Sequence, residues 1–256
     1  MRRACTCFSG LLIVIGLAFG SPGIGWAAGN DIQPSGTLGR EDFRLLTRQL
    51  GFAASYFPLA PAAPLGILGF DAGIEATAVN ISQNSGFWQK AVRDGAPPSY
   101  LVVPRVHVQK GLPLNLDVGA SFTTIPFTNI SIIGGEVKWA VVGGGVLMPA
   151  LAVRLSGTKL FGGSEVGLET YSADVSISKG VLFFTPYAGI GQMYVNSRTD
   201  SAAIRAANGV DFRETETLTK TFVGLKISPP VFPFSLVAEA DFATVAAYSL
   251  RLNFSF

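Results

Sequence analysis

The sequence predicts an all-β protein: a closed antiparallel transmembrane β-barrel of about ten strands, preceded by a short helix. Three observations predict it. Apolar and polar residues alternate through most of residues 65–256, as in strands with one apolar face. Charged residues make up only 14% of the 256 residues, against about 25% in an ordinary soluble domain. Mean hydropathy is nevertheless +0.41, which alternating strands explain without long apolar helices.

The first 28 residues have the three regions of a secretory signal peptide. Two arginines follow Met1, an apolar stretch spans residues 11–20, and small residues at 25–28 offer a cleavage site. The apolar stretch is shorter than the roughly 20 residues that a membrane helix needs. Both cysteines, Cys5 and Cys7, precede it. We therefore expect an exported chain that loses residues 1–28 and has no disulfide.

Residues 29–64 are expected to form a periplasmic segment with a short amphipathic helix. Within 40–50, Phe43, Leu46 and Leu50 recur at helical spacing. The helix is expected to rest at the barrel mouth, with a plug or a periplasmic lid as the alternative.

The stretch 51–70 contains no charge and has the length of a membrane helix. Prolines at 58, 61 and 64 argue against a helical span, because each removes a backbone donor and clashes with the preceding turn.

The barrel is predicted to occupy residues 65–256. In the last strand, Tyr248, Leu250 and Leu252 alternate with polar neighbours, and the same pattern recurs along the chain. A membrane-spanning strand uses about 9–11 residues, so ten strands fit, and twelve remain compatible. The ten predicted strands are 65–82, 100–110, 115–126, 130–142, 146–160, 167–180, 183–197, 216–228, 234–244 and 246–256.

The predicted connections differ in length. Longer or more polar ones, at 83–99, 161–168 and 198–214, alternate with short turns, although two on the longer side are also short. Short turns on one side and long loops on the other are typical of outer-membrane barrels. The alternative is a secreted two-sheet sandwich, in which the apolar faces would point inward and the charged faces outward.

By strand parity, fourteen charged or histidine side chains are expected to face the lumen. Two interpretations are open: opposite charges pair into a polar core, or they select solutes in a narrow pore. The predicted lumen residues are Asp71, Glu75, Arg105, His107, Asp117, Glu136, Lys138, Arg154, Asp174, Lys220, Lys226, Glu239, Asp241 and Arg251.

The sequence predicts no catalytic residue, cofactor or metal ion. His107 is the only histidine, and Gln109 stands two residues later where a serine would share its face. One histidine and no mature cysteine argue against a zinc site. The formal net charge of +2, without a basic run, argues against a nucleic-acid partner.

Residues 248–256 alternate and end on Phe256, and this resembles the signal that the barrel-assembly machinery reads in bacterial outer-membrane barrels. Residues 184–191 are similar to a segment common in small porin-like barrels. The resemblance implies residence in the bacterial outer membrane, with membrane lipid and the assembly machinery as partners.

We expect a structural protein or a narrow passive channel for small solutes. The alternative is a surface-loop binding or adhesion module, with the polar loop 196–216 recognising a ligand. A lipid- or peptide-modifying enzyme is the remaining alternative.

Overall fold

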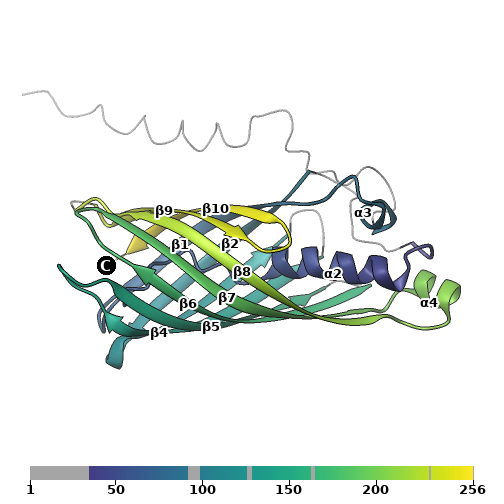
Figure 1. Ribbon diagram of the computed structural model, residues 1–256, viewed down its shortest axis with the longest axis horizontal. Coiled ribbons are helices and arrows are strands. Elements are labelled where there is room, and N and C mark those ends of the chain that lie inside the picture. Colours follow the sequence, from purple (N-terminus) through teal and green to yellow (C-terminus); the bar gives the residue numbers. More distant parts are fainter. Residues whose placement is uncertain (1–34, 92–98, 126–128, 163–164, 231, 256) are drawn as a thin grey trace, which may run out of the picture.

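Ten antiparallel strands close into a barrel in the computed structural model (Figure 1). The structure describes residues 35–91, 99–125, 129–162, 165–230 and 232–255. The predicted signal peptide therefore lies outside the described residues. Each strand pairs with its neighbours in sequence, and β1 pairs with β10 to close the sheet. The predicted fold class is confirmed. The strands are β1 Phe70–Asn80, β2 Tyr100–Leu112, β3 Leu116–Thr124, β4 Ser131–Gly143, β5 Ala150–Phe161, β6 Val166–Ser178, β7 Phe184–Thr199, β8 Arg213–Ile227, β9 Phe234–Phe242 and β10 Ala246–Ser255.

Apolar side chains point outward from the barrel and polar side chains point into it. In β10, Leu250 and Leu252 are about half exposed, whereas Arg251 and Asn253 are buried. This is the arrangement that lipid requires, because a sheet can cross hydrocarbon only when it closes and presents an apolar exterior. The alternative of two stacked sheets with an apolar interior is excluded.

Some strand bounds differ from the predicted ones. β1 begins at Phe70 and not at residue 65, because Gly66 adopts a positive φ of 79° in a turn closed by the Gly69 amide and the Gly66 carbonyl. β5 begins at Ala150 and not at 146, and β8 begins at Arg213 and not at 216.

In the described residues, three α-helices and one short 3-10 helix accompany the strands. The helices are α2 Arg40–Ala54, α3 Gly86–Ala91 and α4 Ala202–Asn208, and the 3-10 helix is η1 Pro113–Asn115. α2 continues four residues past the predicted end. α3 and α4 lie in connections for which the sequence analysis predicted no helix. No helix in the described ranges is long and apolar enough to cross a membrane.

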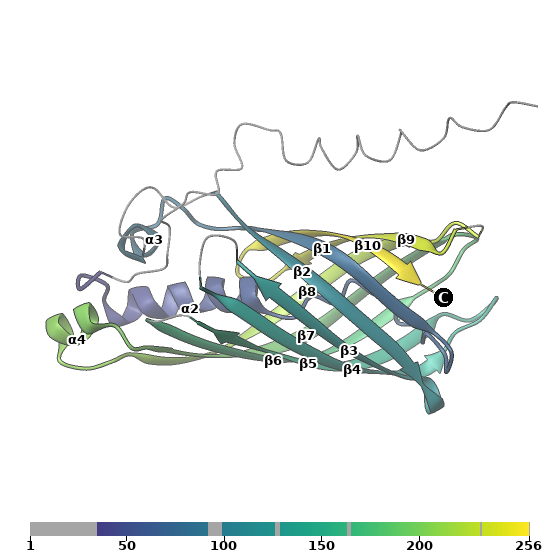
Figure 2. The same ribbon diagram turned by 180° about the vertical axis from the view of Figure 1, so that it is seen from behind.

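The two ends of the barrel differ. One end, the loop end, holds residues 81–91 and 200–212 of the β1–β2 and β7–β8 connections, and the α-helices of the described residues lie there too (Figures 1 and 2). The other, the turn end, holds the connection 144–149 and residues 228–230 and 232–233, and β10 ends there at Ser255. In outer-membrane barrels the longer loops are extracellular and the short turns periplasmic.

Residues 35–65 lie inside the barrel, and not outside it as the expected periplasmic segment would. We call residues 35–65 the plug. At the loop end, Thr47 of α2 contacts Ser197 of β7, with 2.5 Å between their hydroxyl oxygens. At the turn end, the amide of Leu65 donates to the Asp117 carboxylate of β3. The plug therefore enters at the loop end. The barrel has room for it, because a barrel of about eight strands is filled by its own side chains, whereas ten strands enclose a wider lumen.

Candidate functional site

The candidate site is the plugged lumen, and α2 is the part of the plug nearest the loop end. Its spacing of apolar residues produces one buried face that includes Phe43, Leu46 and Phe52. Phe43 packs against Phe212 from the β7–β8 connection, with ring centroids 6.1 Å apart. The expectation that the helix merely rests at the mouth is corrected, since this face is enclosed.

The opposite face of α2 is tied to the rim of β8. Arg40 Nε lies 2.6 Å from Glu214 Oε1, and Arg44 Nε lies 2.6 Å from Glu216 Oε1. Arg48, one further turn along, lies 3.8 Å from Glu216. We call these five residues the rim clasp. The hydrogen bond to Glu216, followed by its charge, raises the pKa of Arg44.

A second set of contacts joins α2 to the β1–β2 connection. The side-chain oxygen of Gln49, Oε1, accepts a hydrogen bond from the indole nitrogen of Trp88 at 2.7 Å. The side-chain nitrogen of Gln49, Nε2, donates to the Ser82 hydroxyl. Lys90 Nζ lies 2.6 Å from Asp42. α3 therefore holds α2 from the side opposite β8.

Gly51 marks a close approach of the plug to the wall. A Cβ at this position would lie 2.4 Å from Val195 Cγ1 of β7. We expect Gly51→Ala to lower the free energy of unfolding by about 1–3 kcal/mol through overpacking, although alanine otherwise favours a helix by about 1 kcal/mol. Adding Val195→Ala should restore most of the loss in a urea titration. A Gly51→Ala variant that is more stable than the parent would show that no such contact exists.

After α2, residues 55–65 cross the lumen without helix or strand, and we call them the lumen segment. The prolines at 58, 61 and 64 carry no amide hydrogen, so three positions need no acceptor. The backbone carbonyls remain and must be satisfied inside the barrel.

Basic side chains of the wall satisfy six of those carbonyls. Five of the six predicted lumen bases donate to the main chain of the lumen segment. The donor–acceptor distances are Arg105 to Ser55 3.1 Å, Lys220 to Tyr56 3.2 Å, Arg251 to Pro58 3.0 Å, Arg154 to Ala60 3.4 Å, and Lys138 to both Pro61 and Ala63 3.0 Å.

Acidic side chains accept two of the amides of the lumen segment. The amide of Leu59 donates to Glu239 at 3.0 Å, and the amide of Leu65 donates to Asp117 at 3.1 Å. The Tyr187 hydroxyl donates to the same Glu239 carboxylate at 2.7 Å. The wall thus recognises the main chain of the lumen segment from both its donor and its acceptor sides.

The same charges also pair with one another. Glu75 accepts from Arg105 Nη1 at 3.0 Å and from Arg251 Nε at 2.9 Å. Arg154 lies 3.1 Å from Glu136, and Lys138 lies 2.9 Å from Asp117. Buried charges are tolerated when they are paired and hydrogen-bonded in this way.

His107 belongs to this network. Its Nδ1 lies 3.1 Å from Arg251 Nη1, its Nε2 lies 3.9 Å from Glu136, and the residue is 2% exposed. Within the described residues, no group of three or more histidine, cysteine or acidic side chains could hold a metal ion.

The structure places thirteen of the fourteen predicted lumen residues in the buried interior. Lys226 is partly exposed at the turn end, where it lies 3.4 Å from Asp71. Asp174 is buried, but neither carboxylate oxygen has a hydrogen-bond partner in the described part of the chain. A cavity of about 220 Å³ lies beside Pro61 and Lys226 at this end.

The residues that sequence reasoning missed are those of the lumen segment. One signal was present: a charge-free, proline-rich stretch accompanies a barrel with thirteen predicted lumen charges. Such a stretch offers carbonyls to bases without adding a competing charge.

No protein-family model matches the chain, and no curated protein matches it. Solved structures similar to it include the N-terminal β-barrel domain of Pseudomonas aeruginosa OprF, with 14% identity, a TM-score of 0.37, and coverage of 75% of this chain and 99% of that chain. The attachment invasion locus protein Ail of Yersinia pestis has 12% identity and a TM-score of 0.34, and the match covers 73% of this chain and 97% of that chain. Neisserial surface protein A has 8% identity and a TM-score of 0.31, and the match covers 73% of this chain and 94% of that chain.

Proposed function

We propose that this protein is a non-enzymatic outer-membrane barrel that acts as a narrow passive channel, closed at rest by its own plug. One observation carries the proposal: the wall holds the lumen segment through side chains that bind its main chain. These bonds require neither strand pairing nor a covalent link. The plug can therefore leave without breaking the barrel.

The bonds that hold the lumen segment favour the closed state, and water can replace each of them. A hydrogen bond to a charged group contributes about 1.5–3 kcal/mol net. Withdrawal of the plug would flood the lumen, and water would replace the lost partners of the bases and acids. The path left behind would be polar and lined by both signs of charge, which suits small hydrophilic solutes.

A disulfide between the plug and the wall tests this function. Thr47 and Ser197 are in side-chain contact, and the predicted mature chain has no cysteine, because Cys5 and Cys7 lie in the signal peptide. We expect Thr47→Cys/Ser197→Cys to show no openings in planar-bilayer recordings when oxidised. Reduction should restore the openings of the parent.

Two controls accompany the recording. Each single cysteine variant should behave as the parent under both redox conditions. A Glu214→Gln/Glu216→Gln variant, which weakens the rim clasp, should open more often than the parent. Absence of openings in the parent and in the clasp variant alike would reject the channel and leave a purely structural barrel.

A surface-binding module is a second candidate, and the shape of the β7–β8 hairpin favours it. This hairpin extends beyond its neighbours at the loop end and carries α4 at its tip (Figure 1). Arg205 and Asp211 lie 2.7 Å apart and order the tip, where Val210 is 59% exposed. Replacing residues 202–208 by a Gly-Ser linker should then abolish binding of whole cells to a partner without affecting membrane insertion.

We further propose that export removes residues 1–28 and that the assembly machinery reads Tyr248–Phe256. An epitope placed directly before residue 35 offers a test of topology. Since the plug enters at the loop end, the epitope should be accessible to antibody on intact cells. Detection only after the outer membrane is permeabilised would show that the epitope lies on the periplasmic side, and the proposed orientation would be wrong.

A further inference from the structure

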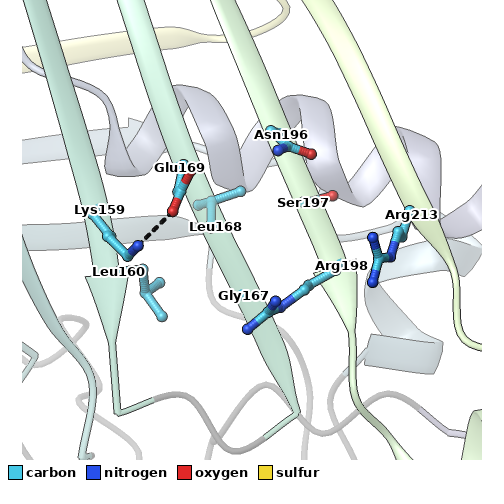
Figure 3. A pocket seen from close by; sticks show the side chains of 9 residues that line it. All are labelled: Lys159, Leu160, Gly167, Leu168, Glu169, Asn196, Ser197, Arg198 and Arg213. Carbon is cyan, nitrogen blue, oxygen red and sulfur yellow. Dashed lines mark ion pairs between the residues drawn. The ribbon is translucent and has the colours of Figure 1, made fainter.

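A hollow on the outer wall of the barrel carries charged side chains that make no contact with the plug. It has a volume of about 210 Å³ and lies near the loop end, across strands β5 to β8 (Figure 3). The charged side chains around it are Lys159, Glu169, Arg198 and Arg213. An outward-facing charged cluster on a lipid-facing wall needs a physical explanation.

The two arginines face each other without an acid between them. Arg198 of β7 and Arg213 of β8 are direct cross-strand partners, and like charges in that position are destabilising. Arg198 Nε lies 3.5 Å from Asp200 Oδ2. Arg213 has no ion pair with any residue that the structure describes. An anion bound between the two guanidinium groups would remove the repulsion.

The remaining lining favours the same ligand. Lys159 Nζ lies 2.7 Å from Glu169 Oε1, so the single acid of the hollow is already neutralised. The Arg198 side chain lies over Gly167, where a Cβ atom would come within 2.9 Å of Arg198 Nε. The glycine therefore opens the hollow and admits the guanidinium to it.

The height of the hollow on the barrel identifies the source of the anion. Tyr171 and Tyr194 are cross-strand partners that face outward, about half exposed, and tyrosines of this kind mark the membrane interface. Arg198 lies four residues beyond Tyr194, which is about 13 Å along the strand. With a strand tilt of about 40°, the rise along the membrane normal is about 10 Å. The headgroup layer begins at the aromatic belt and is about 5–7 Å thick. A long arginine side chain at the height of Arg198 can reach back to the phosphate groups of this layer.

We propose that this hollow binds a phosphate group of an outer-leaflet lipid, held by Arg198 and Arg213. Guanidinium groups match phosphate oxygens with paired, charge-assisted hydrogen bonds. The site would fix one lipid to the wall formed by β6, β7 and β8.

Native mass spectrometry of the full mature chain, incubated with diphosphoryl lipid A, tests the proposal. We expect one lipid to be retained, and Arg198→Gln/Arg213→Gln to weaken retention about tenfold or more. Gly167→Val should weaken it too, because its side chain fills the hollow. The matched control is Arg205→Gln, which removes an exposed arginine of α4 and should retain the lipid as the parent does.

Folding of each variant is checked by its heat-dependent electrophoretic mobility. Equal retention by the folded double variant and by the parent would overturn the proposal. Equal retention of lipid A that lacks both phosphates would overturn it as well. If excess inorganic phosphate displaces lipid A completely, the hollow is a site for free phosphate and the lipid assignment is wrong.

Discussion

Replacement of Glu75 by glutamine is expected to lower the free energy of unfolding by about 3–5 kcal/mol, the cost of leaving a buried charge without its partner. Glu75 is the carboxylate shared by Arg105 and Arg251, and all three side chains are buried. Glutamine keeps the size of the side chain and removes its charge. Two guanidinium groups would then lie beside a neutral amide, with no carboxylate between them.

The measurement is a urea titration of the protein refolded in lipid vesicles, followed by tryptophan fluorescence. Glu214→Gln supplies the matched control, because Glu214 pairs with Arg40, whose side chain is 73% exposed. Exposed ion pairs contribute about 0–1 kcal/mol. Equal losses in the two variants would contradict the view that burial determines the importance of these pairs.

Most of the barrel could be predicted from the sequence because its physical constraint acts on every second residue. Lipid requires an apolar outer face, and the lumen accepts polar groups, so parity alone assigns a side to Leu250 and Arg251. Strand bounds are less well specified where the alternation continues past the end of a strand. Residues 65–69 show this, because a glycine turn replaces the start of β1.

The plug could not be predicted in the same way. Amphipathicity of residues 40–50 indicates that one face is buried, but it does not indicate whether that surface lies inside or outside the barrel. The lumen segment has no periodicity, because its partners bind the main chain and select no particular side chain. Its position depends on the width of the closed barrel, which emerges only from the number of strands.

The sequence predicted which side chains face inward, but it did not predict which groups they bind there. The alternatives were mutual pairing and solute selection, and the structure shows a third use of the same groups. Arg154 and Lys138 each pair with an acid and also donate to a carbonyl of the lumen segment. A guanidinium or ammonium group has several donors, so one side chain can serve both roles.

Deletion of residues 35–65 is expected to convert a closed barrel into an open one. The strands would keep their pairing, since the plug contributes no strand to the sheet. The lumen would lose its main-chain partners for five bases, and water would take their place. Planar-bilayer recordings should then show sustained conductance steps that the full chain shows only briefly, with a dependence on salt that reflects the charged lining.

A synthetic peptide of residues 35–65, added from the loop end, should close the deleted barrel again. A peptide of the same composition in scrambled order is the control, because it loses the helix that engages the rim clasp. Folding is verified by heat-dependent mobility before each recording. A folded deletion variant without conductance would mean that the wall side chains collapse inward and seal the lumen themselves. The plug would then serve stability alone, and the charges that bind its carbonyls would be a means of filling the barrel and not of closing a channel.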